Sequence, residues 1–147
     1  MTTLSRLASL GRYVHVAPEV QDALHRSLPV VSLETAISSH GLPVEQALST
    51  AESLDSIIRR AGAVPAVVGL LDGIVKIGCS QKDIERLASS KEKKWKVGRR
   101  DIAPALVKKV NGGTTVSATS FLSHLAGIDV FVTGGIGYGE APSQHGR

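Results

Sequence analysis

Apolar and polar positions follow two different periods along this chain, which predicts short strands separated by helices. Apolar runs typical of buried strands occur at residues 30–33, 66–71, 74–77, 95–98 and 128–133. Amphipathic segments with helical spacing occur at residues 18–24, 44–61, 80–88, 102–110 and 114–126. Strands that alternate with helices favour an α/β fold, with helices covering the faces of a sheet.

Glycine and polar residues predict where these elements turn, begin and end. Asp72-Gly73 joins two apolar runs and is typical of a β-hairpin. Ser80 with Asp83 matches a capping box at the start of one helix, and Asp101 can cap another. Residues 111–113, Asn-Gly-Gly, predict a turn.

Composition places the chain among globular proteins and narrows its partners. Its 147 residues suit one domain, and a hydrophobic share of 42% excludes a disordered chain. The net charge of +4 favours anionic ligands in a general way. Aromatic residues make up only 3% of the chain, which is too few for a surface that stacks nucleic-acid bases. Because Trp95 lies among lysines, a small basic nucleic-acid-binding protein stays an alternative.

The single cysteine, Cys79, excludes an intrachain disulfide and a zinc site built on clustered cysteines, and it favours a reducing compartment. No apolar run approaches the roughly 20 residues that cross a bilayer.

Residues 1–17 carry Arg6, Arg12 and several hydroxyls, with no acid before Glu19. This pattern matches a mitochondrial transit peptide, and an ordinary N-terminus explains it equally well, so the location stays mitochondrial or cytoplasmic.

The main candidate for chemistry is Glu34, which follows the apolar run 30–33 directly. Ligands of open α/β sheets bind beyond the carboxyl ends of the strands, and a carboxylate there can serve as a general acid. The alternative is an acid that caps a helix or forms a surface salt bridge. The small-polar stretch after Glu34 predicts a loop, in which His40 is a base, a phosphate ligand or a residue that fixes the turn.

Three cations, Lys96, Arg99 and Arg100, lie within five residues at the end of a predicted strand. They can capture a phosphate or carboxylate, or they can form a solvated basic face. Backbone amides of the glycine turn at 111–115 and of the glycine loop at 133–137 could also approach an anion. Neither segment matches a P-loop or a dinucleotide fingerprint, but all these clusters can converge in an α/β fold.

Five ordered motifs resemble the N-terminal half of the pseudouridine-5'-phosphate glycosidase family, from about Val16 to Gly137. They are VVSLETAISSHGLP, AGAVPAVVGLLDGIVKIG, KVGRRDI, NGGTTVSAT and GIDVFVTGGIG. The resemblance implies reversible cleavage of the C–C glycosidic bond of pseudouridine 5'-phosphate to uracil and ribose 5-phosphate. It also implies an α/β/α sandwich with a mixed sheet, trimers, a lysine that forms a Schiff base, and manganese.

Carried over by motif, the resemblance implies that Glu34 donates a proton, that Lys96 binds substrate and that Val116 contacts it. The family's Ser-Thr-Ile after the glutamate is Thr-Ala-Ile here, so Ala36 lacks a hydroxyl. The family's metal-binding aspartate and Schiff-base lysine have no counterpart. We therefore expect no metal ligands in this chain, and manganese only as a property of the family.

These departures lead to three expectations about organisation and activity. The chain divides into a candidate targeting segment (1–17), an N-terminal glycosidase part (18–139) and a tail outside the family pattern (140–147). We expect a truncated enzyme whose sheet is incomplete at the C-terminus, with little activity and a tendency to associate. The alternative is a non-catalytic form that binds sugar phosphate or regulates full-length subunits; neither reading predicts a membrane or nucleic-acid partner.

Overall fold

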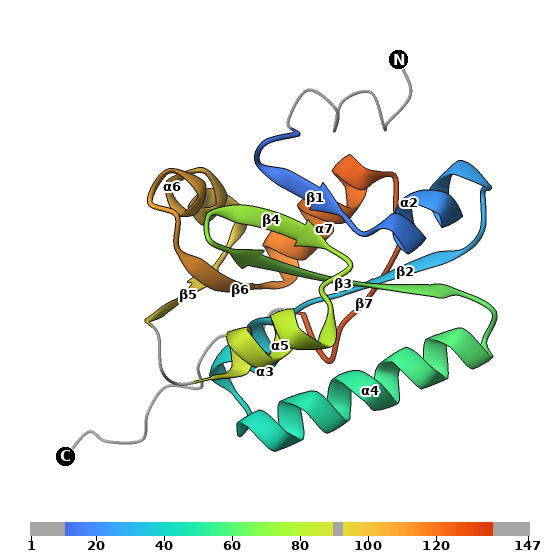
Figure 1. The fold of residues 1–147 in the computed structure, drawn as a ribbon, viewed down its shortest axis with the longest axis horizontal. Helices are drawn as coiled ribbons and strands as arrows, with labels where there is room; N and C mark the ends of the chain where they lie inside the picture. Colours follow the sequence, from blue (N-terminus) through green and yellow to red (C-terminus); the bar gives the residue numbers. More distant parts are fainter. Residues whose placement is uncertain (1–10, 90–92, 137–147) are drawn as a thin grey trace.

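Strand β3 lies at the centre of a mixed sheet of seven strands in the computed structural model, which describes residues 11–89 and 93–136 (Figure 1). The strands are β1 (Val14–Val16), β2 (Val30–Leu33), β3 (Val64–Leu71), β4 (Ile74–Ile77), β5 (Lys94–Val97), β6 (Asn111–Thr114) and β7 (Val130–Val132). The helices are α2 (Pro18–His25), α3 (Ala36–His40), α4 (Val44–Arg60), α5 (Gln81–Ala88), α6 (Ile102–Val107) and α7 (Val116–Ala126), with a 3-10 turn, η1 (Arg99–Asp101).

Two strands share one edge of β3 and point at each other. Strand β2 runs parallel to the first half of β3, and β6 runs antiparallel to its second half. Strand β4 pairs with the opposite edge of β3 at residues 68–71. Strand β6 must therefore pair with the same edge of β3 as β2, beyond the point where β2 ends. The carboxyl ends of β2 and β6 therefore meet, and the parallel neighbours β7 and β5 bring their own carboxyl ends to the same region.

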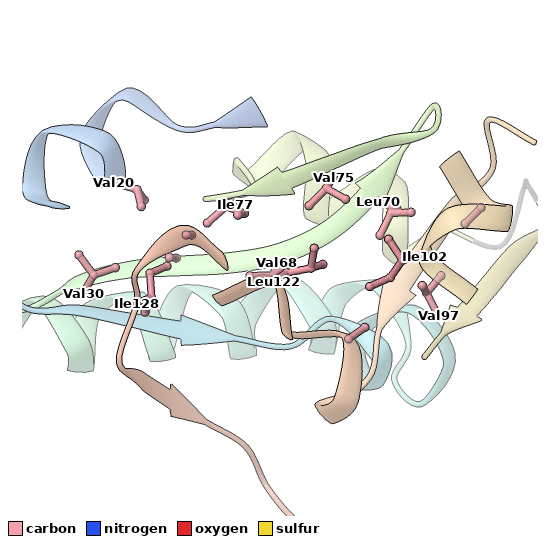
Figure 2. Packing of buried hydrophobic residues seen from close by; sticks show 14 of the residues in the cluster. Val20, Val30, Val68, Leu70, Val75, Ile77, Val97, Ile102, Leu122 and Ile128 are labelled. Carbon is pink, nitrogen blue, oxygen red and sulfur yellow. The ribbon is translucent and has the colours of Figure 1, made fainter. Parts of the chain in front are cut away.

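Helices cover both faces of the sheet, which confirms the predicted α/β/α sandwich with a mixed sheet. Figure 1 shows α3, α4 and α5 on one side and α2, α6 and α7 on the other. Alternation along β3 explains this arrangement, because Val68 and Leu70 face the α2, α6 and α7 side. They pack there with Leu122 of α7 and Ile102 of α6 in the main aliphatic core (Figure 2).

Most local signals in the sequence are confirmed. Asp72 and Gly73 have φ values of 53° and 73°, as a tight hairpin between β3 and β4 requires. Ser80 and Asp83 form the predicted capping box of α5. Helix α4 occupies almost the whole predicted span, and α7 ends at Gly127 with a φ of 79°.

Three local predictions are wrong. The predicted turn at residues 111–113 is the buried strand β6, because glycine allows close packing there. The predicted loop after Glu34 contains helix α3. Asp101 does not cap α6, because the Asp101 carboxylate accepts a hydrogen bond from the Gly98 N–H at 2.9 Å instead. Helix α6 also ends three residues earlier than predicted.

The N-terminal segment contributes to the sheet, since Val14–Val16 pairs in parallel with β4. Residues 1–10 of the candidate targeting segment lie outside the described residues. Within residues 11–89 and 93–136, every helix is too short or too polar to span a lipid bilayer.

Lowering the pH should destabilise the protein through Asp83, which joins α5 to β4. Its side chain is only 13% exposed, and its carboxylate accepts hydrogen bonds from Lys76 Nζ at 2.8 Å and from Ser80. Burial raises the pKa of Asp83, but the bonds from Lys76 and Ser80 outweigh burial and hold this pKa below its usual value. The stabilisation is therefore present above the unfolded-state pKa of about 4 and lost as pH falls through the lower folded-state value.

Asp83→Asn should accordingly lower the free energy of unfolding at pH 7 and flatten its decline below about pH 4. Asp22→Asn is the matched control, because Asp22 pairs with Arg26 at the exposed surface. Denaturant unfolding measured at several pH values checks this. Equal acid sensitivity of wild type and Asp83→Asn would contradict it.

Candidate functional site

A cavity of about 1020 Å³ lies where the carboxyl ends of β2, β5, β6 and β7 converge. Glu34, Lys96 and Val116, the three site residues predicted from the sequence, all line it. They follow or end three different strands and are brought together by the meeting of β2 with β6 beside β5. The predicted convergence of polar clusters at strand ends is therefore observed for these residues.

Glu34 is half-buried in the wall formed by β2 and β7. The parallel register pairs Leu33 with Val132, so Glu34 and Thr133 come next on the two strands. The Thr133 hydroxyl donates to Glu34 Oε1 at 2.6 Å. Glu34 makes no salt bridge among the described residues.

Cations form another part of the cavity lining. Lys96 lies at the end of β5, and Arg99 lies in the 3-10 turn that follows. The Arg99 guanidinium stacks over the Phe121 ring, 4.5 Å from its centroid, so an α7 side chain holds it in place. Arg100, the third predicted cation, is 94% exposed and lies outside this cavity.

One face of α7 supplies cavity residues that the sequence analysis did not select. Ser117, Ser120, Phe121 and His124 recur at helical spacing and all line the cavity. The sequence alone shows this spacing, which indicates a polar face on a helix whose other residues are mostly apolar. The signal was missed because no strand end or glycine loop lies next to these residues.

His40 joins α3 to β5 at the cavity through contacts of its two ring nitrogens. Its Nδ1 lies 2.7 Å from Ser39 Oγ, and its Nε2 lies 3.4 Å from the Lys94 carbonyl oxygen. In the neutral ring, Nε2–H donates to that carbonyl and Nδ1 accepts from the Ser39 hydroxyl. Both ring nitrogens are therefore engaged by the protein, which favours the interpretation of His40 as a residue that fixes local structure.

A buried hydroxyl network holds the meeting point of β2 and β6. The Thr35 hydroxyl donates to the Val68 carbonyl at 2.7 Å and accepts from the Thr114 N–H at 3.0 Å. The Thr114 hydroxyl donates to the same carbonyl at 2.6 Å and accepts from Thr119 at 2.9 Å. The three threonines are at most 1% exposed, so the position of the residues on either side depends on these bonds.

Thr35→Val should lower the free energy of unfolding by about 1–3 kcal/mol, because it leaves the buried Thr114 N–H without a partner. Valine keeps the shape of the side chain, so the loss measures the hydroxyl. Thr50→Val on the exposed face of α4 is the control and should change stability by less than about 0.5 kcal/mol. Urea unfolding of both variants checks this, and equal midpoints would contradict it.

The two glycine segments differ in what they offer a ligand. Residues 111–114 are buried in β6, and the amides of Thr114 and Thr115 donate to Thr35 Oγ1 and to the Val97 carbonyl. The predicted anion-binding turn is therefore absent there. Gly135 and Ile136 do line the cavity, and the rest of that glycine loop, from residue 137, lies outside the described residues.

The donor set of the described chain does not fit a resident metal ion. Within residues 11–89 and 93–136, no three His, Cys, Asp or Glu side chains gather closely enough to hold one. Cys79 lies outside the main cavity, and burial raises the pKa of its thiol to about 12, so it stays protonated and is no nucleophile at neutral pH.

Comparison with known proteins identifies relatives over most of the chain. It is 48% identical over 128 residues to a pseudouridine-5'-phosphate glycosidase of Arabidopsis thaliana, covering 87% of this chain and 39% of that protein. It is 42% identical over 142 residues to the enzyme of that name from Escherichia coli, covering 97% of this chain and 46% of that protein. The chain therefore spans about two fifths of the length of these relatives.

Solved structures lead to the same group. The prealnumycin C-glycosynthase AlnA, solved in complex with ribulose 5-phosphate, matches with a TM-score of 0.74 and 37% identity. An indigoidine synthase A-like protein of Thermotoga maritima matches with a TM-score of 0.73 and 36% identity. Each match covers 84% of this chain and 39% of the other. A model of the indigoidine synthase A-like proteins matches residues 19–142. The relatives named pseudouridine-5'-phosphate glycosidase confirm the resemblance carried by the motifs, and the chain belongs to the indigoidine synthase A-like family.

Proposed function

We propose that this chain supplies the carboxylate and the cations of a site that acts on pseudouridine 5'-phosphate. The observation that carries the proposal is that Glu34 and Lys96, which are far apart in the sequence, line one cavity. The names of the enzyme relatives support the same substrate, and the ribulose 5-phosphate bound to AlnA supports a sugar phosphate as the ligand class.

The cavity residues divide into a phosphate-binding group and a proton-transferring group. Lys96 and Arg99 carry the positive charge that a sugar phosphate requires, and the stacked Arg99 is pre-oriented by Phe121. Val116 offers its backbone at the start of α7. Glu34 transfers the proton that uracil gains when its carbon–carbon bond to the sugar breaks, and it takes the proton back in the reverse reaction.

The Schiff base that the family resemblance implies for opening the ribose would need a lysine with a neutral amine. Among the described lysines, only Lys96 lines the cavity, where we assign it to the phosphate. Lys76 is held by Asp83 at 2.8 Å and lies elsewhere. We therefore propose that the 147-residue polypeptide binds sugar phosphate but releases little or no uracil.

Calorimetric titration with ribose 5-phosphate, with ribose as the control ligand, tests the binding step. Binding of the phosphate ester and none of ribose is the expected result. Absence of ribose 5-phosphate binding would overturn the proposal. An assay of uracil release from pseudouridine 5'-phosphate, with manganese added, tests the second step, and turnover equal to that of a full-length relative would refute the predicted inactivity.

A second candidate function is a non-catalytic form that associates with full-length subunits. Strand β7 favours it, because Val130 and Val132 are 51% and 48% exposed and β7 pairs only with β2 among the described strands. Mixing this polypeptide with a full-length pseudouridine-5'-phosphate glycosidase and measuring co-elution and activity tests it. Independent elution together with unchanged activity would exclude this function.

A further inference from the structure

Thr133 holds the carboxyl group of Glu34 from the neighbouring strand. The two residues follow paired positions of β7 and β2, and the Thr133 hydroxyl donates to Glu34 Oε1 at 2.6 Å. This length is typical of a hydrogen bond from a hydroxyl to an ionised carboxylate, which is about twice as strong as a neutral one.

The turn after β7 fixes the direction of this hydroxyl. The Gly135 N–H donates to Thr133 Oγ1 at 3.3 Å, and the Gly135 carbonyl oxygen lies 3.2 Å from the same atom. The hydroxyl has one hydrogen, and its contact with Glu34 at 2.6 Å is shorter than its contact with the Gly135 carbonyl at 3.2 Å, so the hydrogen lies on the Glu34 side. The turn after β7 thus orients the Thr133 hydroxyl, and this hydroxyl donates its hydrogen to Oε1 of Glu34.

The two oxygens of Glu34 therefore differ in their surroundings. Oε1 accepts the Thr133 bond, and no other hydrogen bond to Glu34 is made by the described residues. Oε2 is the oxygen left for a ligand in the cavity that Glu34 lines. A fixed Oε1 also fixes the plane of the carboxyl group, which limits Oε2 to a narrow set of positions.

We propose that Thr133 is a positioning residue that assigns proton transfer by Glu34 to Oε2. This inference rests on the proposed function. When Glu34 donates, the Oε2–H bond breaks and its electron pair stays on the carboxylate, while the accepting carbon supplies the pair for the new C–H bond. Thr133 keeps its own hydrogen throughout, and its bond to Oε1 stabilises the carboxylate that remains.

Carbon-13 NMR of the Glu34 carboxyl group and proton NMR of the Thr133 hydroxyl test the inference. Thr133→Val should abolish the hydroxyl signal and shift the Glu34 carboxyl signal, whereas Thr133→Ser should restore the wild-type carboxyl position. Ser120→Ala removes another hydroxyl from the same cavity and should leave the Glu34 signal in place. An unshifted signal in Thr133→Val, or a failure of serine to restore it, would overturn the inference.

Titration of the same variants with ribose 5-phosphate separates this inference from the proposed function. Thr133→Val should bind the sugar phosphate as wild type does, because Thr133 is assigned to Glu34 and not to the phosphate. Loss of binding in Thr133→Val alone would assign the hydroxyl to the ligand and overturn the positioning role. Loss of binding in wild type would overturn the proposed function, whatever the Glu34 signal shows.

Discussion

Gly113→Ala should lower the free energy of unfolding by about 3 kcal/mol or more, at the upper end of the cost of overpacking a core. Gly113 is buried in β6 beside α3. A methyl group there would overlap Ser39 Oγ and would lie 2.8 Å from the Thr35 carbonyl oxygen. The Thr35 N–H donates to the Thr114 carbonyl, and the Thr35 hydroxyl is bonded to Thr114 and Val68, so Thr35 cannot move away without breaking the buried hydroxyl network.

Thermal unfolding measures this cost, which corresponds to a midpoint lower by roughly 6–12 °C for a chain of this length. Gly134→Ala is the matched control, because no atom lies within 4 Å of the position that its methyl group would take. It should unfold within about 0.5 kcal/mol of wild type. Equal midpoints for the two alanine variants would show that β6 does not pack against α3 as described.

Lys96→Ala should weaken ribose 5-phosphate binding by about 10–100-fold, since a hydrogen bond to a charged group contributes about 1.5–3 kcal/mol. Stability should change little, because Lys96 is exposed at the end of β5. The expected loss is therefore confined to the ligand and does not reflect a damaged fold.

Lys93→Ala is the control for charge, because Lys93 is exposed nearby but does not line the cavity. It removes the same unit of charge, and a purely long-range electrostatic effect would weaken binding similarly in both variants. Calorimetric titration at constant ionic strength compares them. Equal affinities of Lys96→Ala and wild type would remove Lys96 from the phosphate-binding group.

Much of the fold could be predicted from the sequence because its strongest signals are local. The 17 residues of α4 keep one apolar face, and the Asp72-Gly73 turn requires the left-handed backbone that these two residues tolerate. Glu34 could be selected for the same reason, since an acid directly after an apolar run marks a strand end. The cavity confirms that this strand end meets the one that carries Lys96.

The errors concern residues whose role depends on distant neighbours. The sequence Asn111-Gly112-Gly113 has the composition of a turn, but its glycines allow β6 to fit between β3, β5 and α3. A methyl group on Gly112 would lie 2.9 Å from the Trp95 carbonyl oxygen, which no local pattern reveals. The polar face of α7 was missed for a related reason, because its importance depends on the cavity that it borders.

The opposed approach of β2 and β6 along one edge of β3 implies that the proposed ligand binding depends on complete folding of the sheet. Glu34 and Val116 line the cavity together only when both β2 and β6 are paired with β3. A partly folded chain that lacks either pairing therefore does not form the site. A ligand that binds only the native state raises the free energy of unfolding in proportion to the logarithm of its concentration. Protection of the β3 amides against hydrogen exchange should therefore report occupancy of a cavity that β3 itself does not line.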